Sequence, residues 1–513
     1  MVATAGPVAA NPAPVLLTDG RRPTFVHLVA EYGRYARTGG LGEAVMGLAQ
    51  AQQAGGHDVV VFLPLYRTVR DVAPDLAPLG RPLPITLGGR TEEARYFREV
   101  HPPSGPRVVF VDLPWAFGRA GLYGEGGAAY GDNALRYAFF CRAALEAIPR
   151  LIAAPVLLHA HDWHAALALM YLRTQTELRM RLGDPPAVFS VHNAGYQGHY
   201  GPDVLGPCGI PAEAYTHETM EWYGQVNLLK GGLAYADQVV TVSPGHAREL
   251  RTTLGGFGLH GIFSWLSDRL TGITNGIDTT VWDPSSDPHI AATYAADDLT
   301  PKARCKAALQ RSFGLPQRRR LPLFAFTGRL VTQKGIDLLL ASASLHTLDA
   351  QFVFLGTGER RYEESLLALA LERPQHVAVQ LDFTDALEHK LMAGADLFLM
   401  PSQYEPCGLT QLRAQRYGTL PVGRRVGGIA DTVRDDATGF LFDAYDAGAL
   451  DQAVARALAR YQDPDAWEVR MREAMRTDVS WARAASGYAE VYRRAVAHHA
   501  RGGSATLLRA AAP

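Results

Sequence analysis

Short apolar runs rich in β-branched and aromatic residues alternate with helical patterns along almost the whole chain, which restricts the fold more than any other feature. The runs predict strands at Phe25–Ala30, Val59–Leu63, Val108–Val111, Val156–His159, Val188–Val191, Val239–Val242, Leu323–Thr327, Phe352–Leu355, Val377–Leu381, Leu397–Met400 and Leu420–Val422. Strands that are separated by helices form βαβ units, which build parallel sheets covered by helices. The sequence therefore predicts an α/β protein.

A stretch of turn-forming residues divides the strands into two sets. Residues 276–300 show no periodicity and contain two Asp-Pro pairs, so we expect an interdomain connection there. We predict one doubly wound parallel sheet over residues 23–275 and a second one over 301–483. We expect residues 1–22 to form a disordered tail, and residues 484–513 to form a helix followed by a loose tail.

The composition narrows the possible partners and location. The chain has 513 residues, 47% of them hydrophobic and 20% charged, and a net charge of −1. This balance does not favour nucleic-acid binding, and no apolar run reaches the ~18 residues of a membrane span. The four cysteines are widely spaced, which argues against a zinc site or disulfides and favours a cytoplasmic protein. The oligomeric state remains open.

An acidic loop follows one of the predicted buried strands. Leu397–Met400 leads into residues 401–412, where Glu405 precedes a proline and Gly408 precedes a predicted helix. A carboxylate, a glycine and a helix start at the carboxyl end of a strand are typical of ligand sites in open α/β sheets. Taken alone, an ordinary connection with a solvated glutamate fits this stretch equally well.

Two further loops favour the binding of an anion. Residues 37–43 (Arg-Thr-Gly-Gly-Leu-Gly-Glu) open a helix after the first strand, although their spacing does not match a dinucleotide fingerprint. Residues 328–335 place Arg329 and Lys334 five positions apart after a buried strand, a spacing suited to a diphosphate. The alternatives are a structural glycine turn and a solvated basic loop.

The histidine-rich run 159–164 allows two interpretations. It resembles a metal cluster, but the sequence nominates no further ligands, so we expect no metal. We place His161 at the carboxyl end of the strand, and we expect Asp162 to cap the next helix. The alternative is a histidine that is satisfied within the core.

Taken together, these motifs resemble the bacterial glycogen synthase and plant starch synthase family. The resemblance runs from Phe25 to Tyr492, and its landmarks are residues 37–43, 159–164, 192–198, 227–230, 241–244, 275–278, 329–335, 405–412 and 427–428. It implies the GT-B fold, with two Rossmann-like domains facing a central cleft, an acceptor-side N-terminal domain and a nucleotide-sugar-side C-terminal domain. It also implies transfer of glucose from ADP-glucose to the non-reducing end of an α-1,4-glucan, with retention, without a metal and without any other cofactor.

The resemblance assigns roles to particular residues. Catalytic roles fall to Glu405, His161, Arg329 and Lys334. The residues expected to bind the nucleotide sugar are Arg37, Gly39, Gly40, Gly42, Glu43, Asn275, Phe383, Cys407, Gly408, Leu409 and Thr410. The acceptor side is expected to use Asp162, His192, Asn193 and Tyr196.

Three departures from the family pattern affect the expected donor. Arg37 stands where the family usually has Lys, Glu43 where it has Asp, and Gln403 where it has Arg. UDP-glucose or a small acceptor therefore remains an alternative, as does a glucan-binding protein without activity. A non-catalytic protein would not need the diphosphate-binding cations.

Overall fold

The computed structural model describes residues 14–102 and 104–502. The chain divides into two compact units. Unit 1 comprises residues 1–242, 247–273 and 481–513, and unit 2 comprises residues 243–246 and 274–480. Each unit contains its own sheet and its own buried hydrophobic core.

Unit 1 is built on a ten-stranded sheet whose order is β15-β14-β10-β9-β1-β2-β6-β5-β3, with β4 paired to β5. The strands are β1 (Thr24–Leu28), β2 (Val59–Pro64), β3 (Leu76–Pro78), β4 (Leu83–Leu87), β5 (Arg90–Glu99), β6 (Arg107–Asp112), β9 (Val156–His161), β10 (Ala187–Val191), β14 (Gln238–Thr241) and β15 (Leu270–Gly272). All six predicted strands are present and pair in parallel with one another. Smaller pairings join β7 (Gly124–Glu125) to β8 (Ala128–Ala129), and β11 (His199–Tyr200), β12 (Glu221–Trp222) and β13 (Gln225–Asn227) to one another.

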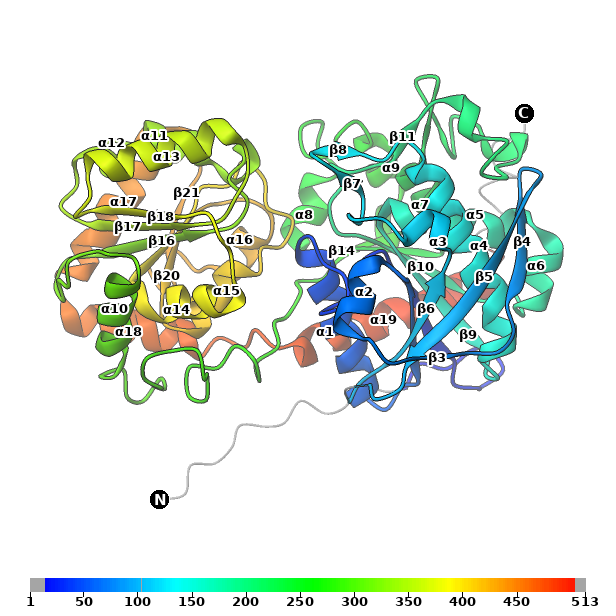
Figure 1. Cartoon of the computed structure of the whole chain (residues 1–513), viewed down its shortest axis with the longest axis horizontal. Coiled ribbons are helices and arrows are strands. Elements are labelled where there is room, and N and C mark those ends of the chain that lie inside the picture. Colours follow the sequence, from blue (N-terminus) through cyan, green and yellow to red (C-terminus); the bar gives the residue numbers. More distant parts are fainter. Residues whose placement is uncertain (1–13, 103, 503–513) are drawn as a thin grey trace, which may run out of the picture. The chain divides into compact units, whose positions relative to one another are not determined.

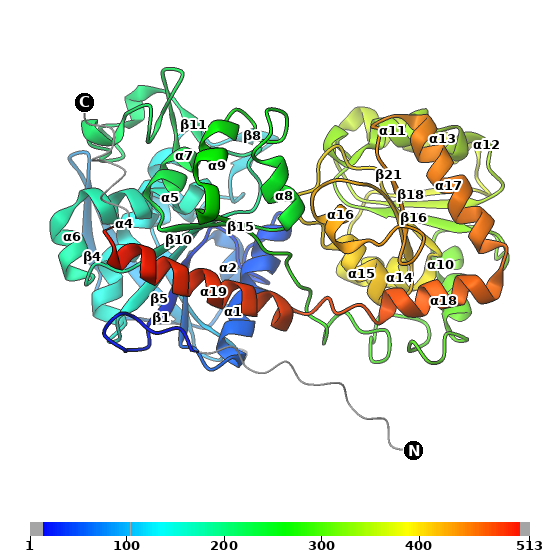
Figure 2. The same ribbon diagram turned by 180° about the vertical axis from the view of Figure 1, so that it is seen from behind.

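The helices of unit 1 include one that comes from the far end of the chain. They are α1 (Gly40–Ala54), α2 (Arg67–Val72), α3 (Pro114–Phe117), α4 (Asn133–Leu151), α5 (Asp162–Thr174), α6 (Thr176–Arg181), α7 (Leu228–Tyr235), α9 (His260–Trp265) and α19 (Trp481–Ala500), and α8 (Pro244–Glu249) begins within 243–246. Helix α19 lies beside α1 (Figures 1 and 2) and buries Tyr488 and Tyr492 in the core of unit 1. The helix predicted over 484–500 is confirmed, but it belongs to unit 1 and is not a separate segment.

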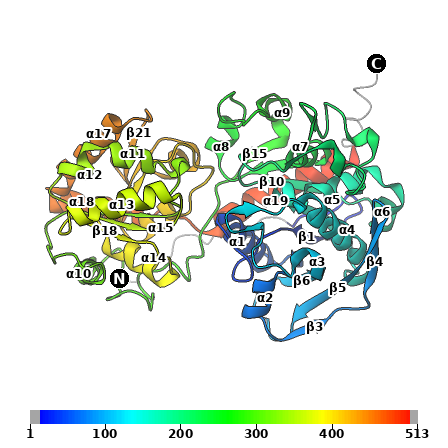
Figure 3. The same ribbon diagram turned by 45° about the horizontal axis from the view of Figure 1, so that its top comes forward.

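Unit 1 departs from the predicted all-parallel sheet at one edge. Strands β3, β4 and β5 pair antiparallel beyond β6 (Figure 3). The turn between β4 and β5 contains Gly88 and Gly89, both with positive φ, as tight hairpins require. Strand β5 was missed because most of its residues are charged or polar and only two are buried.

Unit 2 is a six-stranded parallel sheet in the order β18-β17-β16-β19-β20-β21. The strands are β16 (Leu323–Thr327), β17 (Gln351–Leu355), β18 (Val377–Gln380), β19 (Leu397–Met400), β20 (Leu420–Arg424) and β21 (Phe440–Phe442). The helices are α10 (Lys302–Ser312), α11 (Ile336–Ala341), α12 (Ala343–Thr347), α13 (Arg360–Glu372), α14 (Asp385–Gly394), α15 (Thr410–Arg416), α16 (Gly427–Thr432), α17 (Ala447–Tyr461) and α18 (Pro464–Met475). In Figure 1 the group α11, α12 and α13 lies on one side of the strands, and α10, α14, α15 and α18 lie on the other side.

The expectation for the interdomain connection is wrong, and the expectation of a disordered tail is wrong for residues 14–22. The stretch 276–300 is part of unit 2, because Ile277, Trp282, Tyr294 and Leu299 are buried in its core. Of the tail expected over residues 1–22, residues 1–13 lie outside the described residues. The described part contains a turn at residues 18–20, and Val15 is buried in the core of unit 1.

Candidate functional site

In unit 2, two loops meet at the carboxyl ends of the neighbouring strands β16 and β19. The amide of Gln403 donates to the carbonyl of Gln333 at 2.8 Å, and Gln333 Nε2 donates to the carbonyl of Tyr404 at 3.3 Å. Gly335 has a φ of +76°, and a Cβ at this position would clash with the Pro401 carbonyl. The backbone itself therefore holds the two loops together.

The contact of the two loops pairs a lysine with a glutamate. Lys334 Nζ donates to Glu405 Oε2 at 2.5 Å, and Ser402 Oγ donates to the same oxygen at 3.1 Å. The side chain of Lys334 is 23% exposed and that of Glu405 is 7% exposed. The structure thus brings together a cation suited to a phosphate and a carboxylate suited to sugar hydroxyl groups.

Arg329 belongs to the same loop as Lys334 but has different surroundings. Its side chain is exposed, and Nη2 donates to Gln333 Oε1 at 3.1 Å. The predicted pair of cations therefore consists of one lysine held against Glu405 and one arginine at the surface. An exposed guanidinium can form the two parallel hydrogen bonds that a phosphate accepts.

The loop after Glu405 is tightly packed. The amide of Gly428 donates to the Glu405 carbonyl at 3.0 Å, and a Cβ on Gly428 would clash with the backbone of Cys407. Burial raises the pKa of the Cys407 thiol to about 12, and this thiol also interacts with the backbone of Asn275. Gly408 has a φ of +69°. Four of the residues predicted for the donor thus surround one turn: Asn275, Cys407, Gly408 and, half-buried, Leu409.

The remaining residues predicted on unit 2 flank this turn. Thr410 is the first residue of α15, one position later than the predicted start. Phe383 is 46% exposed and lies in the loop that follows β18. An exposed ring at the carboxyl end of a strand can stack on a flat heterocycle.

In unit 1, an unpredicted glutamate fixes the glycine-rich loop. Buried Glu31 accepts hydrogen bonds from the Thr38 amide at 2.6 Å and from the Thr38 hydroxyl at 2.8 Å, and a third from Tyr123. Arg37 forms an ion pair with Glu43 at 3.2 Å. No sequence signal marked Glu31, because its partners lie in two separate segments.

Two glycines of this loop, Gly39 and Gly42, have different surroundings. Gly39 precedes α1, which begins at Gly40. Gly42 is packed against backbone, since a Cβ on it would lie 3.1 Å from the Ala36 carbonyl. Gly39 has nothing within 4 Å of the corresponding position, so a ligand can approach it closely.

At the carboxyl ends of β9 and β10, Asp162 has a role other than the predicted helix cap. Its Oδ1 accepts from the amide of His192 at 2.7 Å, and His161 occupies the cap position of α5. Asp162 has a φ of +55°, an uncommon conformation for a non-glycine residue. Burial raises its pKa to about 7. Asp162 therefore ties together the ends of the two strands.

The acceptor-side residues follow β10. His192 and Asn193 are half-buried, and Asn193 Oδ1 accepts from the Gly195 amide at 2.9 Å. Tyr196 is exposed. The hydrogen bond from the His192 amide to Asp162 joins the loop after β10 to the start of α5, next to fully buried His161.

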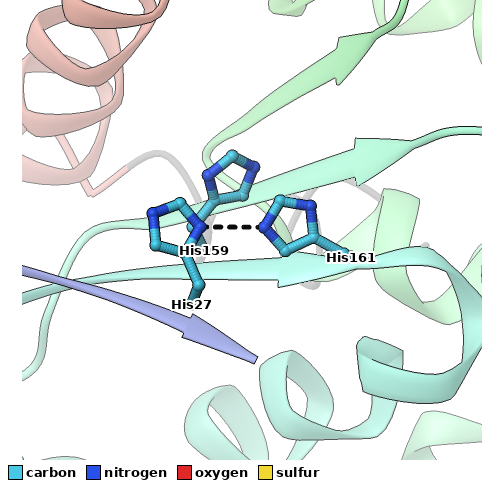
Figure 4. Close-up of side chains that lie close together, drawn as sticks. All are labelled: His27, His159 and His161. Atoms are coloured by element: carbon cyan, nitrogen blue, oxygen red, sulfur yellow. Dashed lines mark hydrogen bonds between the residues drawn. The ribbon is translucent and has the colours of Figure 1, made fainter. Parts of the chain in front are cut away.

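His161 also belongs to a cluster with His27 and His159 (Figure 4). Their six ring nitrogens all have protein partners: His27 contacts His161 and Gln52, His159 contacts Tyr492 and Ser190, and His161 also contacts His192. A metal ligand needs a free lone pair, so hydrogen bonds explain this cluster without an ion. His27 was not predicted, because only the pairing of β1 with β9 brings it to His159.

Among the described residues, none of the helices combines the length and apolar character that crossing a membrane requires.

Comparisons with known proteins agree over most of the chain. The family described as starch synthase catalytic domain matches residues 24–265, and glycosyl transferases group 1 matches residues 311–474. A glycogen synthase of Anaeromyxobacter sp. (strain Fw109-5) is 43% identical over 476 residues, which cover 91% of this chain and 98% of that protein. Glycogen synthase 2 of Geobacter sulfurreducens is 40% identical over 475 residues, with the same coverage.

A solved structure extends this agreement to the fold. The catalytic domain of starch synthase IV from Arabidopsis thaliana, bound to ADP and acarbose, superposes with a TM-score of 0.85 at 33% identity. The match covers 93% of this chain and 99% of that one.

Proposed function

Because the chain belongs to the glycogen and starch synthase family of glucosyltransferases with the GT-B fold, we propose that it takes glucose from ADP-glucose and adds it, with retention, to the non-reducing end of an α-1,4-glucan. The observation that carries the proposal is the pair of Lys334 and Glu405, with Arg329 on the same loop. The ADP bound to the related Arabidopsis enzyme supports an adenine nucleotide.

The chemistry of the donor explains why a cation and a carboxylate are needed together. Cleavage of the bond between sugar and diphosphate leaves negative charge on the phosphate oxygens and positive charge on the sugar ring. Arg329 and Lys334 stabilise the phosphate charge. Glu405 binds sugar hydroxyl groups and stabilises the positive ring, and the amides of Cys407, Gly408 and Leu409 share the binding.

In this proposal, two cations from the protein take the place of a metal ion. Fixed positive charges that are already oriented toward the leaving group need little rearrangement during the reaction. Phe383 stacks on the base, and the glycine-rich loop with Arg37 and Glu43 binds the donor from unit 1. His161 contacts the glucosyl group, and Asp162 binds the glucan together with His192, Asn193 and Tyr196 of the loop after β10.

One experiment tests the donor, the acceptor and the metal. Release of ADP and UDP is measured from ADP-glucose and UDP-glucose, with and without glycogen, and with EDTA. We expect glycogen-dependent ADP release that EDTA does not reduce, and α-1,4 linkages in the product. Faster UDP release would replace the proposed donor, and loss of activity in EDTA would contradict transfer without a metal. Glycogen binding without release of either nucleotide would favour a protein that only binds glucan.

A further inference from the structure

Six hydrogen bonds join seven side chains of unit 1 into one continuous chain. In order, these side chains are His192, His161, His27, Gln52, Tyr492, His159 and Ser190. The separations run from 2.7 to 3.1 Å, within the normal range for hydrogen bonds. Strands β1, β9 and β10 and helices α1 and α19 all contribute a member, so the chain links the centre of the sheet to the helices beside it.

The four histidines that belong to this hydrogen-bonded series are neutral, because burial lowers the pKa of each. A neutral imidazole donates from one ring nitrogen and accepts at the other. A ring that donates to one neighbour must therefore accept from its other neighbour, so all six hydrogen bonds run in the same donor-to-acceptor direction. The amide of Gln52 sets this direction, because its oxygen only accepts and its nitrogen only donates.

The orientation of Gln52 determines the protonation of each ring. Gln52 Oε1 faces His27 Nε2 at 2.8 Å, and Gln52 Nε2 donates to the Tyr492 hydroxyl at 2.7 Å. His27 therefore carries its proton on Nε2 and accepts at Nδ1 from His161 Nε2, at 2.9 Å. This leaves Nδ1 of His161 as a lone-pair acceptor, which faces His192 Nε2 at 3.1 Å.

We propose that Gln52 and Tyr492 are positioning residues that hold Nδ1 of His161 as a hydrogen-bond acceptor for a hydroxyl group of the transferred sugar. In the free protein His192 Nε2–H occupies this acceptor, and a hydroxyl group, which also donates one hydrogen bond, replaces it when the sugar binds. A preset tautomer removes a rearrangement that sugar binding would otherwise require. The inference rests on the proposed contact of His161 with the glucosyl group.

Two substitutions at one position separate the tautomer from simple packing. Gln52→Glu keeps an oxygen opposite His27, so His161 keeps its protonation. Gln52→Leu removes that acceptor, and a buried N–H without a partner is costly. His27 then moves its proton to Nδ1 and donates to His161, which reverses the role of His161 Nδ1.

The tautomers are read by NMR of ¹⁵N-histidine-labelled protein without substrate, with His161 and His192 assigned through single substitutions. We expect His161 to carry its proton on Nε2 in the wild type and in Gln52→Glu, and on Nδ1 in Gln52→Leu. The kcat/KM for the nucleotide sugar should fall about tenfold in Gln52→Leu, equivalent to ~1.4 kcal/mol. It should stay within about threefold of wild type in Gln52→Glu.

An unchanged His161 tautomer in Gln52→Leu would overturn the proposal, and so would equal losses of activity in the two variants. Should Gln52→Leu not fold, Tyr492→Phe provides the same test. That variant removes one oxygen atom, frees the Gln52 amide to rotate, and should give a mixture of His161 tautomers, whereas a single unchanged tautomer would count against the proposal. Because the NMR experiment needs no donor, its failure is distinguishable from a failure of the proposed function.

Discussion

Replacing Lys334 or Glu405 by alanine should abolish most of the glucosyl transfer without unfolding the protein. In the structure Lys334 Nζ lies 2.5 Å from Glu405 Oε2. Two unit charges even 4 Å apart interact by ~4 kcal/mol at an effective dielectric constant of 20, so both groups are strongly held before the donor binds. A matched control is Lys390→Ala, because Lys390 is exposed on α14 of the same unit.

The expected loss of rate follows from the charge that each group stabilises. One charge-assisted contact to a leaving diphosphate contributes ~3 kcal/mol to lowering the barrier, which corresponds to about 100-fold in kcat. Each single substitution also leaves a largely buried charge without its partner, which should cost ~2 kcal/mol of unfolding free energy. The double variant should lose less stability than the sum of the two single variants, because it leaves neither charge unpaired.

The assay is release of nucleoside diphosphate at saturating donor and glycogen, combined with urea unfolding of every variant. We expect kcat to fall about 100-fold in Lys334→Ala and in Glu405→Ala, and to stay within twofold of wild type in Lys390→Ala. A folded Lys334→Ala variant that keeps a third of the wild-type kcat would refute the assigned role of the lysine. The same result for Glu405→Ala would remove the carboxylate from the mechanism.

Three further predictions concern stability and donor binding. Burial lowers the pKa of His27 from 6.5 to about 4. Between these two pH values His27 is therefore protonated in the unfolded chain and neutral in the folded protein. About 3 kcal/mol of stability present above pH 6.5 should be lost as the pH falls to 4, and urea unfolding should show a weaker pH dependence in His27→Gln; equal pH dependence would contradict this. Gly335→Ala should lower the unfolding free energy by more than Gly314→Ala, since both glycines have positive φ but only a Cβ on Gly335 meets backbone, at Pro401. Equal unfolding free energies in the two variants would show that the loop can shift to accommodate the Cβ. Phe383→Ala should raise the KM for the nucleotide sugar about tenfold with little change in kcat, whereas Phe383→Tyr should behave like wild type; an unchanged KM in Phe383→Ala would exclude stacking.

The eleven strands that were predicted could be recognised because most of their residues are buried and apolar. Strands β15 and β21 were not predicted, since each has only three residues. Leu323–Thr327 and Leu397–Met400 have the predicted bounds. Strand β5 could not be predicted, because an edge strand keeps its charged residues in solvent and lacks an apolar run. The stretch 276–300 was misassigned because turn-forming residues also occur where a chain covers a core.

Residues of the site could be predicted only where each of them comes soon after a predicted strand. Lys334 and Glu405 each follow a predicted strand, and the pairing of β16 with β19 brings these strands together. Gln52 and Tyr492 lie 440 positions apart, so no local pattern connects them. Glu31 likewise lacks a signal, since a buried carboxylate looks like any other glutamate until its donors are located.

The position of α19 has a consequence for synthesis of the protein on the ribosome. The residues of unit 2 leave the ribosome before α19 does, although α19 supplies Tyr488 and Tyr492 to the core of unit 1. The earlier residues of unit 1 must therefore persist with an open hydrophobic face until α19 has been synthesised. Exposed apolar surface of this kind is prone to aggregation, so we expect chaperones to bind the chain during that interval. A chain that stops before α19 would lack part of the core of unit 1, although the other residues of that core are synthesised first.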